Sequence, residues 1–118
     1  ALSTDGGAIP RNTTIEQGLA LVEFGALSLD DFVRKACLNA ARMFGLASKG
    51  HLGPGADADV TIVDPAQRKA TWVFAHGQTV IQAGTVVGKG GRVATTPRGV
   101  PYLKSEGIES VIAAPDWI

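Results

Sequence analysis

The stretch KGHLGPGADADVTIVD, from Lys49 to Asp64, decides the fold because it predicts a change of structure over a short distance. Its first half is a polar turn rich in glycine and proline. Its second half contains Val60 to Val63, a run of residues that favour a strand. The preceding run, Asn39 to Leu46, is typical of the end of a helix. The sequence therefore predicts a helix, a turn and a strand in this order.

Two helices are predicted before this turn. Thr13 and Glu16 have the spacing of a capping box, so a first helix is expected to begin there and to end near Gly25. Ser28 is a suitable N-cap for the apolar stripe that follows it. This stripe predicts a second helix over about residues 29 to 44.

The residues after the turn predict a small antiparallel meander. Its hairpin turns are expected at His76-Gly77 and Ala83-Gly84, between runs of strand-forming residues: 60–63, 70–75, 79–82 and 85–87. Trp72 and Phe74 alternate with Val73, so their rings are expected on one face of the sheet. Glycines then interrupt the pattern, and residues 93–118 are expected to form an extended tail.

Composition excludes several classes of protein. The chain has 118 residues, of which 45% are apolar and 19% charged, and this predicts a globular domain. Its 11 basic and 11 acidic residues are evenly mixed, so neither nucleic acid nor a membrane is an expected partner. The single cysteine excludes an intrachain disulfide framework and favours the cytoplasm. Because the chain starts at Ala1, it is either processed or part of a longer protein.

The helix, turn and strand between Asn39 and Asp64 resemble a junction in the amidohydrolase superfamily, whose members include urease, dihydroorotase, hydantoinase and D-aminoacylase relatives. The resemblance covers about residues 1–87. It implies an α/β fragment: the last strand and helices of a (β/α)8 barrel, followed by part of a small antiparallel β-sandwich. The expected regions are a barrel end over 1–48, a sandwich portion over 49–92 and the tail over 93–118.

Asp5 is the expected catalytic and metal-binding residue. Ala1 to Thr4 is predicted as a strand that ends at Asp5 and Gly6, and carboxylates at the C-terminal ends of barrel strands lie in the catalytic mouth. The resemblance implies that this aspartate binds a divalent metal and takes a proton from metal-bound water. The alternative is a solvated aspartate in a surface turn.

The loop after Asp5 is expected to bind substrate. Gly6 and Gly7 would let a substrate approach the backbone amides, and Pro10-Arg11 is similar to a pair in D-aminoacylase-like members. Arg11 would then face a substrate carboxylate, although a surface arginine is the simpler interpretation of this dipeptide.

The remaining metal ligands of the family cannot be placed in this sequence. His51 and His76 both follow the predicted barrel portion, so each is interpreted as a turn or surface residue. Cys37 is expected to be a buried structural thiol. Asp57 and Asp59 are expected to stabilise the turn, with Asp59 accepting backbone amides where the strand begins.

The resemblance implies hydrolysis of an amide or cyclic amide C–N bond in the intact enzyme, with a divalent metal, zinc by preference, as cofactor. Alone, the chain is expected to be inactive and to hold no metal. Small amides are the expected substrates. Apolar surface on an incomplete barrel predicts either a homo-oligomer or association with a missing N-terminal portion. The alternatives are a non-catalytic interaction module and a truncated copy without function.

Overall fold

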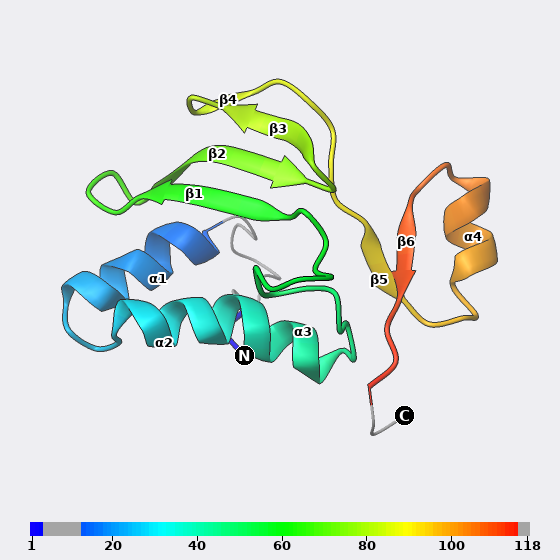
Figure 1. The fold of residues 1–118 in the computed structure, drawn as a ribbon, viewed down its shortest axis with the longest axis horizontal. Helices are drawn as coiled ribbons and strands as arrows, with labels where there is room; N and C mark the ends of the chain where they lie inside the picture. Colours follow the sequence, from blue (N-terminus) through cyan, green and yellow to red (C-terminus); the bar gives the residue numbers. More distant parts are fainter. Residues whose placement is uncertain (4–12, 116–118) are drawn as a thin grey trace.

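The computed structural model describes residues 1–3 and 13–115, which form a helical layer, a four-stranded sheet and a C-terminal βαβ unit (Figure 1). The helices lie along one side of the sheet, and α1 contacts β2 (Figure 1). None of the helices in these two described ranges has the length and apolar content needed to span a bilayer.

The helical layer contains α1 (Thr14–Glu23) and a longer helix built from α2 (Leu29–Val33), η1 (Arg34–Leu38) and α3 (Asn39–Met43). The second predicted helix is therefore confirmed, although its centre is a π turn. Ser28 caps it as expected, since its Oγ accepts a hydrogen bond from the Asp31 amide at 3.0 Å. The predicted capping box is wrong in one detail, because the Thr13 side chain makes no capping hydrogen bond to α1.

The sheet contains β1 (Val60–Asp64), β2 (Lys69–Ala75), β3 (Gln78–Gln82) and β4 (Thr85–Val86), paired antiparallel in this order. The predicted meander is confirmed. His76 and Gly77 have φ values of 54° and 75°, and Ala83 and Gly84 have 48° and 82°. Positive φ at both central residues is the requirement of the type I′ hairpin turn.

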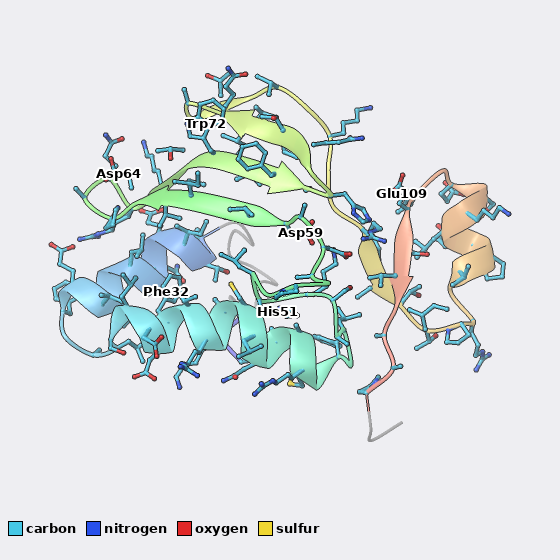
Figure 2. The ribbon with its side chains drawn as sticks, in the orientation of Figure 1. Phe32, His51, Asp59, Asp64, Trp72 and Glu109 are labelled. Carbon is cyan, nitrogen blue, oxygen red and sulfur yellow. The ribbon has the colours of Figure 1, made fainter. Side chains whose placement is uncertain are left out.

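Apolar burial is concentrated in the helical layer. Among the described residues, the buried apolar side chains are Leu19 of α1, Phe32 of α2 and Ala41 of α3. Phe32 points from α2 toward α1 (Figure 2) and packs where α1 carries Gly18. A Cβ added at Gly18 would lie 2.0 Å from Phe32 Cε2, so only glycine lets the two helices approach this closely.

Two expectations about the ends of the chain need correction. Residues 1–3 form no strand; instead, the Leu2 amide donates a hydrogen bond of 3.1 Å to the Lys35 carbonyl in the helical layer. In place of an extended tail, residues 93–112 contain β5 (Val93–Thr95), α4 (Val100–Ser105) and β6 (Ser110–Ile112), with the two strands parallel. These strands are three residues each, too short for an alternating pattern to be recognised.

Candidate functional site

The predicted site residues Asp5, Gly6, Gly7 and Arg11 lie outside the described residues, within the range 4–12. Their roles therefore stay predictions. The structure does describe the chain on both sides of this range, at Ser3 and at Thr13.

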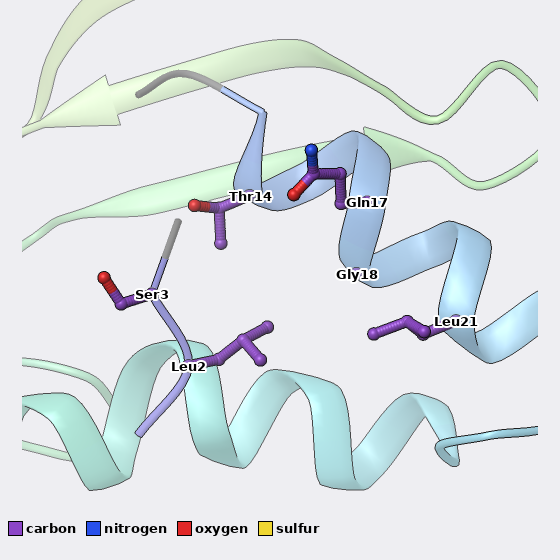
Figure 3. A pocket seen from close by; sticks show the side chains of 6 residues that line it. All are labelled: Leu2, Ser3, Thr14, Gln17, Gly18 and Leu21. Carbon is purple, nitrogen blue, oxygen red and sulfur yellow. The ribbon is translucent and has the colours of Figure 1, made fainter. Parts of the chain in front are cut away.

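A small cavity lies between these two flanking segments (Figure 3). Its volume is about 170 Å³, and its lining joins the N-terminal residues to α1: Leu2, Ser3, Thr14, Gln17, Gly18 and Leu21. Two leucines supply its apolar wall, while Ser3, Thr14 and Gln17 supply hydroxyl and amide groups. The described part of the lining thus offers neutral hydrogen bonds and contains no titratable side chain. Acid or base chemistry at this cavity would need a group such as Asp5.

The N-terminal residues are held to the helical layer at the π turn. A π turn shifts the helical hydrogen-bond register by one residue, and here the Asn39 amide donates to the Arg34 carbonyl. The next carbonyl, that of Lys35, accepts the Leu2 amide at 3.1 Å. The irregular turn thereby fixes the position of Leu2, from which the chain continues toward Asp5.

A second cluster of polar side chains lies where the helical layer meets the sheet. Lys49 follows α3, Asp57 and Asp59 precede β1, and Arg92 precedes β5. The Lys49 ammonium forms ion pairs with both carboxylates and lies 2.7 Å from Asp57 Oδ2. The Arg92 guanidinium lies 2.9 Å from the same oxygen. Asp59 also accepts the His76 amide at 2.8 Å, so the cluster reaches the β2–β3 turn (Figure 2).

The ionisation of this cluster follows from its contacts. The hydrogen bond from Lys49 lowers the pKa of Asp57, although partial burial opposes this shift. Burial would raise the pKa of Asp59, but hydrogen bonds from Lys49 and the His76 amide outweigh it and lower that pKa. Burial likewise opposes the charge on Lys49, and its two aspartate partners reverse this effect and raise its pKa. All three groups are charged near neutral pH.

The described residues do not fit a metal site. No group of three or more histidine, cysteine, aspartate or glutamate side chains converges within 1–3 and 13–115. His51 is exposed and engaged locally: its Nε2 lies 3.0 Å from the Ala47 carbonyl, and its Nδ1 accepts the Gly53 amide at 3.1 Å. The interpretation of His51 as a surface turn residue is confirmed. Metal binding would require donors beyond the described residues.

Sequence analysis missed two members of the charged cluster. Lys49 belongs to the predicted turn without a role of its own, and no pattern singles out Arg92. A signal was present, because two aspartates beside a strand need cations when they are partly buried. The expectation for Cys37 was wrong, since this residue is exposed, although burial on one side raises the pKa of its thiol.

Comparison with known proteins gives a family match over most of the chain. The model of the amidohydrolase family matches residues 1–93. A dihydroorotase of Syntrophus aciditrophicus is 43% identical over 61 residues, which cover 52% of this chain and 13% of that protein. A D-phenylhydantoinase of Escherichia coli is 33% identical over 93 aligned positions, which cover 58% of this chain and 20% of that protein.

A shorter match gives higher identity in the same set of relatives. A dihydroorotase of Pelotomaculum thermopropionicum is 53% identical over 45 residues, which cover 38% of this chain and 10% of that protein. The chain therefore spans a fifth or less of the length of these relatives. The family match covers both helices of the helical layer and the whole four-stranded sheet. The chain belongs to the amidohydrolase family.

Proposed function

We propose that this chain is the C-terminal part of a metal-dependent amidohydrolase that hydrolyses C–N bonds of amides, with cyclic amides as the preferred class. The observation that carries this proposal is the family match over residues 1–93, which includes Asp5 and Arg11. The names of the relatives, dihydroorotase and D-phenylhydantoinase, support cyclic amides as substrates. We further propose that residues 1–48 are the end of the barrel.

Asp5 is the proposed catalytic residue. In the sequence Asp5 comes three positions after Leu2, whose amide donates a hydrogen bond of 3.1 Å to the Lys35 carbonyl. A carboxylate placed here would accept a proton from the attacking water and pass it to the leaving nitrogen as the C–N bond breaks. Gly6 and Gly7 would admit the substrate to backbone amides, and Arg11 would bind a carboxylate on the substrate through two parallel hydrogen bonds.

The proposed metal ligands come only in part from this chain. Asp5 is the one residue that we assign to the metal, and the other donors would belong to parts of the intact enzyme outside these 118 residues. A divalent ion, zinc by preference, would there supply an activated water. The isolated chain is therefore proposed to be inactive.

A chimeric enzyme tests the proposed role of Asp5. Residues 1–93 would replace the matching segment of the Escherichia coli D-phenylhydantoinase, and hydantoin hydrolysis would be measured for the chimera and for its Asp5→Asn variant. Loss of a proton-transferring carboxylate should lower kcat by about 100-fold or more. Glu16→Gln, on an exposed turn of α1, serves as the matched control and should keep full activity. Equal activity of the Asp5→Asn chimera and its parent would overturn the assignment.

The isolated chain gives a second, independent test. Purified protein should bind no zinc in stoichiometric amount and should not hydrolyse dihydroorotate, hydantoins or N-acyl-D-amino acids. Zinc analysis by mass spectrometry and a spectrophotometric assay measure both properties. Stoichiometric zinc together with turnover would show that the chain carries a complete site, contrary to the proposal.

Association is proposed because large apolar side chains are exposed. Phe24 is 81% exposed, Leu52 80% and Val86 71%, while only three apolar side chains are buried among the described residues. Such surface favours burial against another copy of the chain or against the N-terminal portion of the enzyme. Size-exclusion chromatography with light scattering should show an oligomer, and a well-behaved monomer would contradict this. The same exposed surface supports the second candidate, an interaction module that only binds.

A further inference from the structure

We propose that Lys49, Asp57, Asp59 and Arg92 form an ionic joint that sets the orientation of the four-stranded sheet against the helical layer. Three of the side chains come from the connector between α3 and β1, and Arg92 comes from the approach to β5. We infer a conformational role because the ion pairs brace the connector that joins the helical layer to the sheet, and because Asp59 in this connector also accepts the His76 amide of the β2–β3 turn. The joint involves described residues only and does not depend on the proposed hydrolase activity.

The joint is partly buried and densely connected. The side chains of Lys49, Asp57 and Arg92 are only 19%, 21% and 22% exposed, and Asp59 is 37% exposed. Lys49 bridges both aspartates, Arg92 adds a second cation on Asp57, and the His76 amide binds Asp59. Each carboxylate therefore has at least two donors. A network of this kind constrains geometry more strongly than an isolated surface pair.

Backbone hydrogen bonds also hold the connector, from the Asp57 amide to the Ser48 carbonyl at 2.8 Å and from the Gly77 amide to the Ala58 carbonyl at 2.9 Å, whereas the space between α1 and the sheet is open. Between α1 and the sheet lies an open groove of about 390 Å³, lined by α1 and by three strands: Ile15, Glu16, Thr61, Arg68, Lys69, Ala70, Val73 and Ile81. The buried core side chains Leu19, Phe32 and Ala41 all belong to the helices. At the far end of the groove, Arg68 pairs with Glu23, but these side chains are 34% and 65% exposed. An exposed ion pair contributes little free energy, so the Lys49 cluster should constrain the connection between the layers more strongly than the Arg68–Glu23 pair does.

The charges explain why Lys49 is the central member. Its ammonium lies between two carboxylates that would otherwise repel each other at short range. Without Lys49, Arg92 would neutralise only Asp57, and Asp59 would keep only the His76 amide. The aspartates would then separate, and the turn between α3 and β1 would move with them. Charged networks can in this way specify one arrangement without adding much stability.

Energy transfer between the two layers measures their arrangement directly. Cys37, the single cysteine, is exposed on the helical layer and accepts a fluorescent acceptor. Trp72 of β2 is the donor in a Trp117→Phe background, which leaves one tryptophan. Donor lifetimes with and without acceptor give the transfer efficiency and the width of the distance distribution. Far-UV circular dichroism reports separately whether the helices and strands are folded.

Three variants separate the joint from general effects. Lys49→Met keeps the aliphatic stem and removes the charge, and Lys49→Arg keeps the charge as a rescue. Arg34→Met makes a similar change in an exposed pair, Arg34 with Asp30, which lies within one helix and does not cross the layers. Arg92→Met is a milder change, because it removes only the ion pair between Arg92 and Asp57.

We expect Lys49→Met to lower the transfer efficiency and broaden the distance distribution while circular dichroism stays native. Arg92→Met should show a smaller loss of transfer, and Lys49→Arg and Arg34→Met should match the parent. Unchanged transfer in a folded Lys49→Met protein would overturn the proposal. It would also be overturned if Lys49→Met and Arg92→Met both lost circular dichroism in step with transfer, since the cluster would then support folding as a whole.

Discussion

The helical layer and the sheet are stabilised by different interactions. In the helices, Phe32 and Leu19 are buried. The Phe32 ring packs so closely on α1 that no residue larger than glycine fits at position 18. The sheet has no fully buried apolar side chain among its described residues, and Trp72 stacks on Phe74 with ring centroids 6.2 Å apart on a partly exposed face. The sheet instead relies on its hydrogen-bond ladder, its tight turns and the ionic joint.

Because of this difference, substitutions in the helical layer should change the free energy of unfolding, and substitutions in the ionic joint should change the position of the sheet. Apolar packing contributes free energy in proportion to the area removed from water, so the helices should carry most of the stability. Ion pairs contribute less free energy but are directional, so they should fix the position of the sheet.

Phe32→Ala should give the largest loss. This side chain is 6% exposed, and its removal leaves a cavity between α1 and α2 that the helices cannot fill by a small shift. We expect the free energy of unfolding to fall by about 3 kcal/mol. Urea unfolding followed by circular dichroism measures it. Phe24→Ala, at an 81% exposed position, is the matched control and should change stability by less than about 0.5 kcal/mol. Similar losses at the two positions would contradict the contrast.

Gly18→Ala should destabilise the contact between α1 and α2 by adding a methyl group against the Phe32 ring. The added methyl group would overlap the Phe32 ring, and such overpacking costs about 1–3 kcal/mol. Alanine is the better helix former by about 1 kcal/mol, so a net loss of up to about 2 kcal/mol is expected. Gln17→Ala, on the exposed neighbouring position, is the control that tests helix propensity alone. A Gly18→Ala protein at least as stable as the parent would show that the helices can move apart at no cost.

Acid should weaken the joint between the layers. Lys49 lowers the pKa of Asp57 and helps to lower that of Asp59, so the folded protein binds fewer protons than the unfolded chain in mild acid. The stability from these carboxylates is therefore complete above their unfolded pKa of about 3.9 and is lost as pH falls through the lower folded values. Urea midpoints between about pH 6 and pH 2 measure this loss.

The matched variant for the acid effect is Lys49→Met. Without the ammonium, the two aspartates lose the contact that lowers their pKa, and the acid-dependent part of the urea midpoint should shrink. Arg34→Met removes a cation from an exposed pair elsewhere and should leave the acid dependence of the parent. An identical acid profile in Lys49→Met and the parent would assign the effect to carboxylates outside the joint.

The helices and strands that local patterns determine could be predicted from the sequence. The stripe from Phe32 to Phe44 gave the second helix, and residues with strand preference between short turns gave the meander. The π turn could not be predicted, because it depends on one shifted hydrogen bond rather than on residue type. The βαβ unit was missed because strands of three residues carry too little pattern.

The site was less predictable than the fold because its members are distant in sequence. Asp57 and Arg92 are 35 positions apart, and only the packed chain brings them to 2.9 Å. Asp59 was expected to accept amides at the start of its own strand, whereas the amide that it accepts is that of His76, 17 positions away in the β2–β3 turn. Cys37 shows the opposite error: its place on an apolar stripe predicted burial, but the residue is exposed.

Ala83→Asn should give the smallest effect, and its sign is opposite. Ala83 has φ of 48° in the turn between β3 and β4, a conformation that costs alanine about 1 kcal/mol. Asparagine adopts it more readily, so the free energy of unfolding should rise by about 0.5 kcal/mol. Ala66→Asn, in an exposed turn without positive φ, is the control and should not stabilise the protein. A gain at Ala83 alone would show that turn geometry contributes to the stability of the sheet. Equal effects at both sites would contradict this, and the sheet would then not differ from the helical layer in this respect.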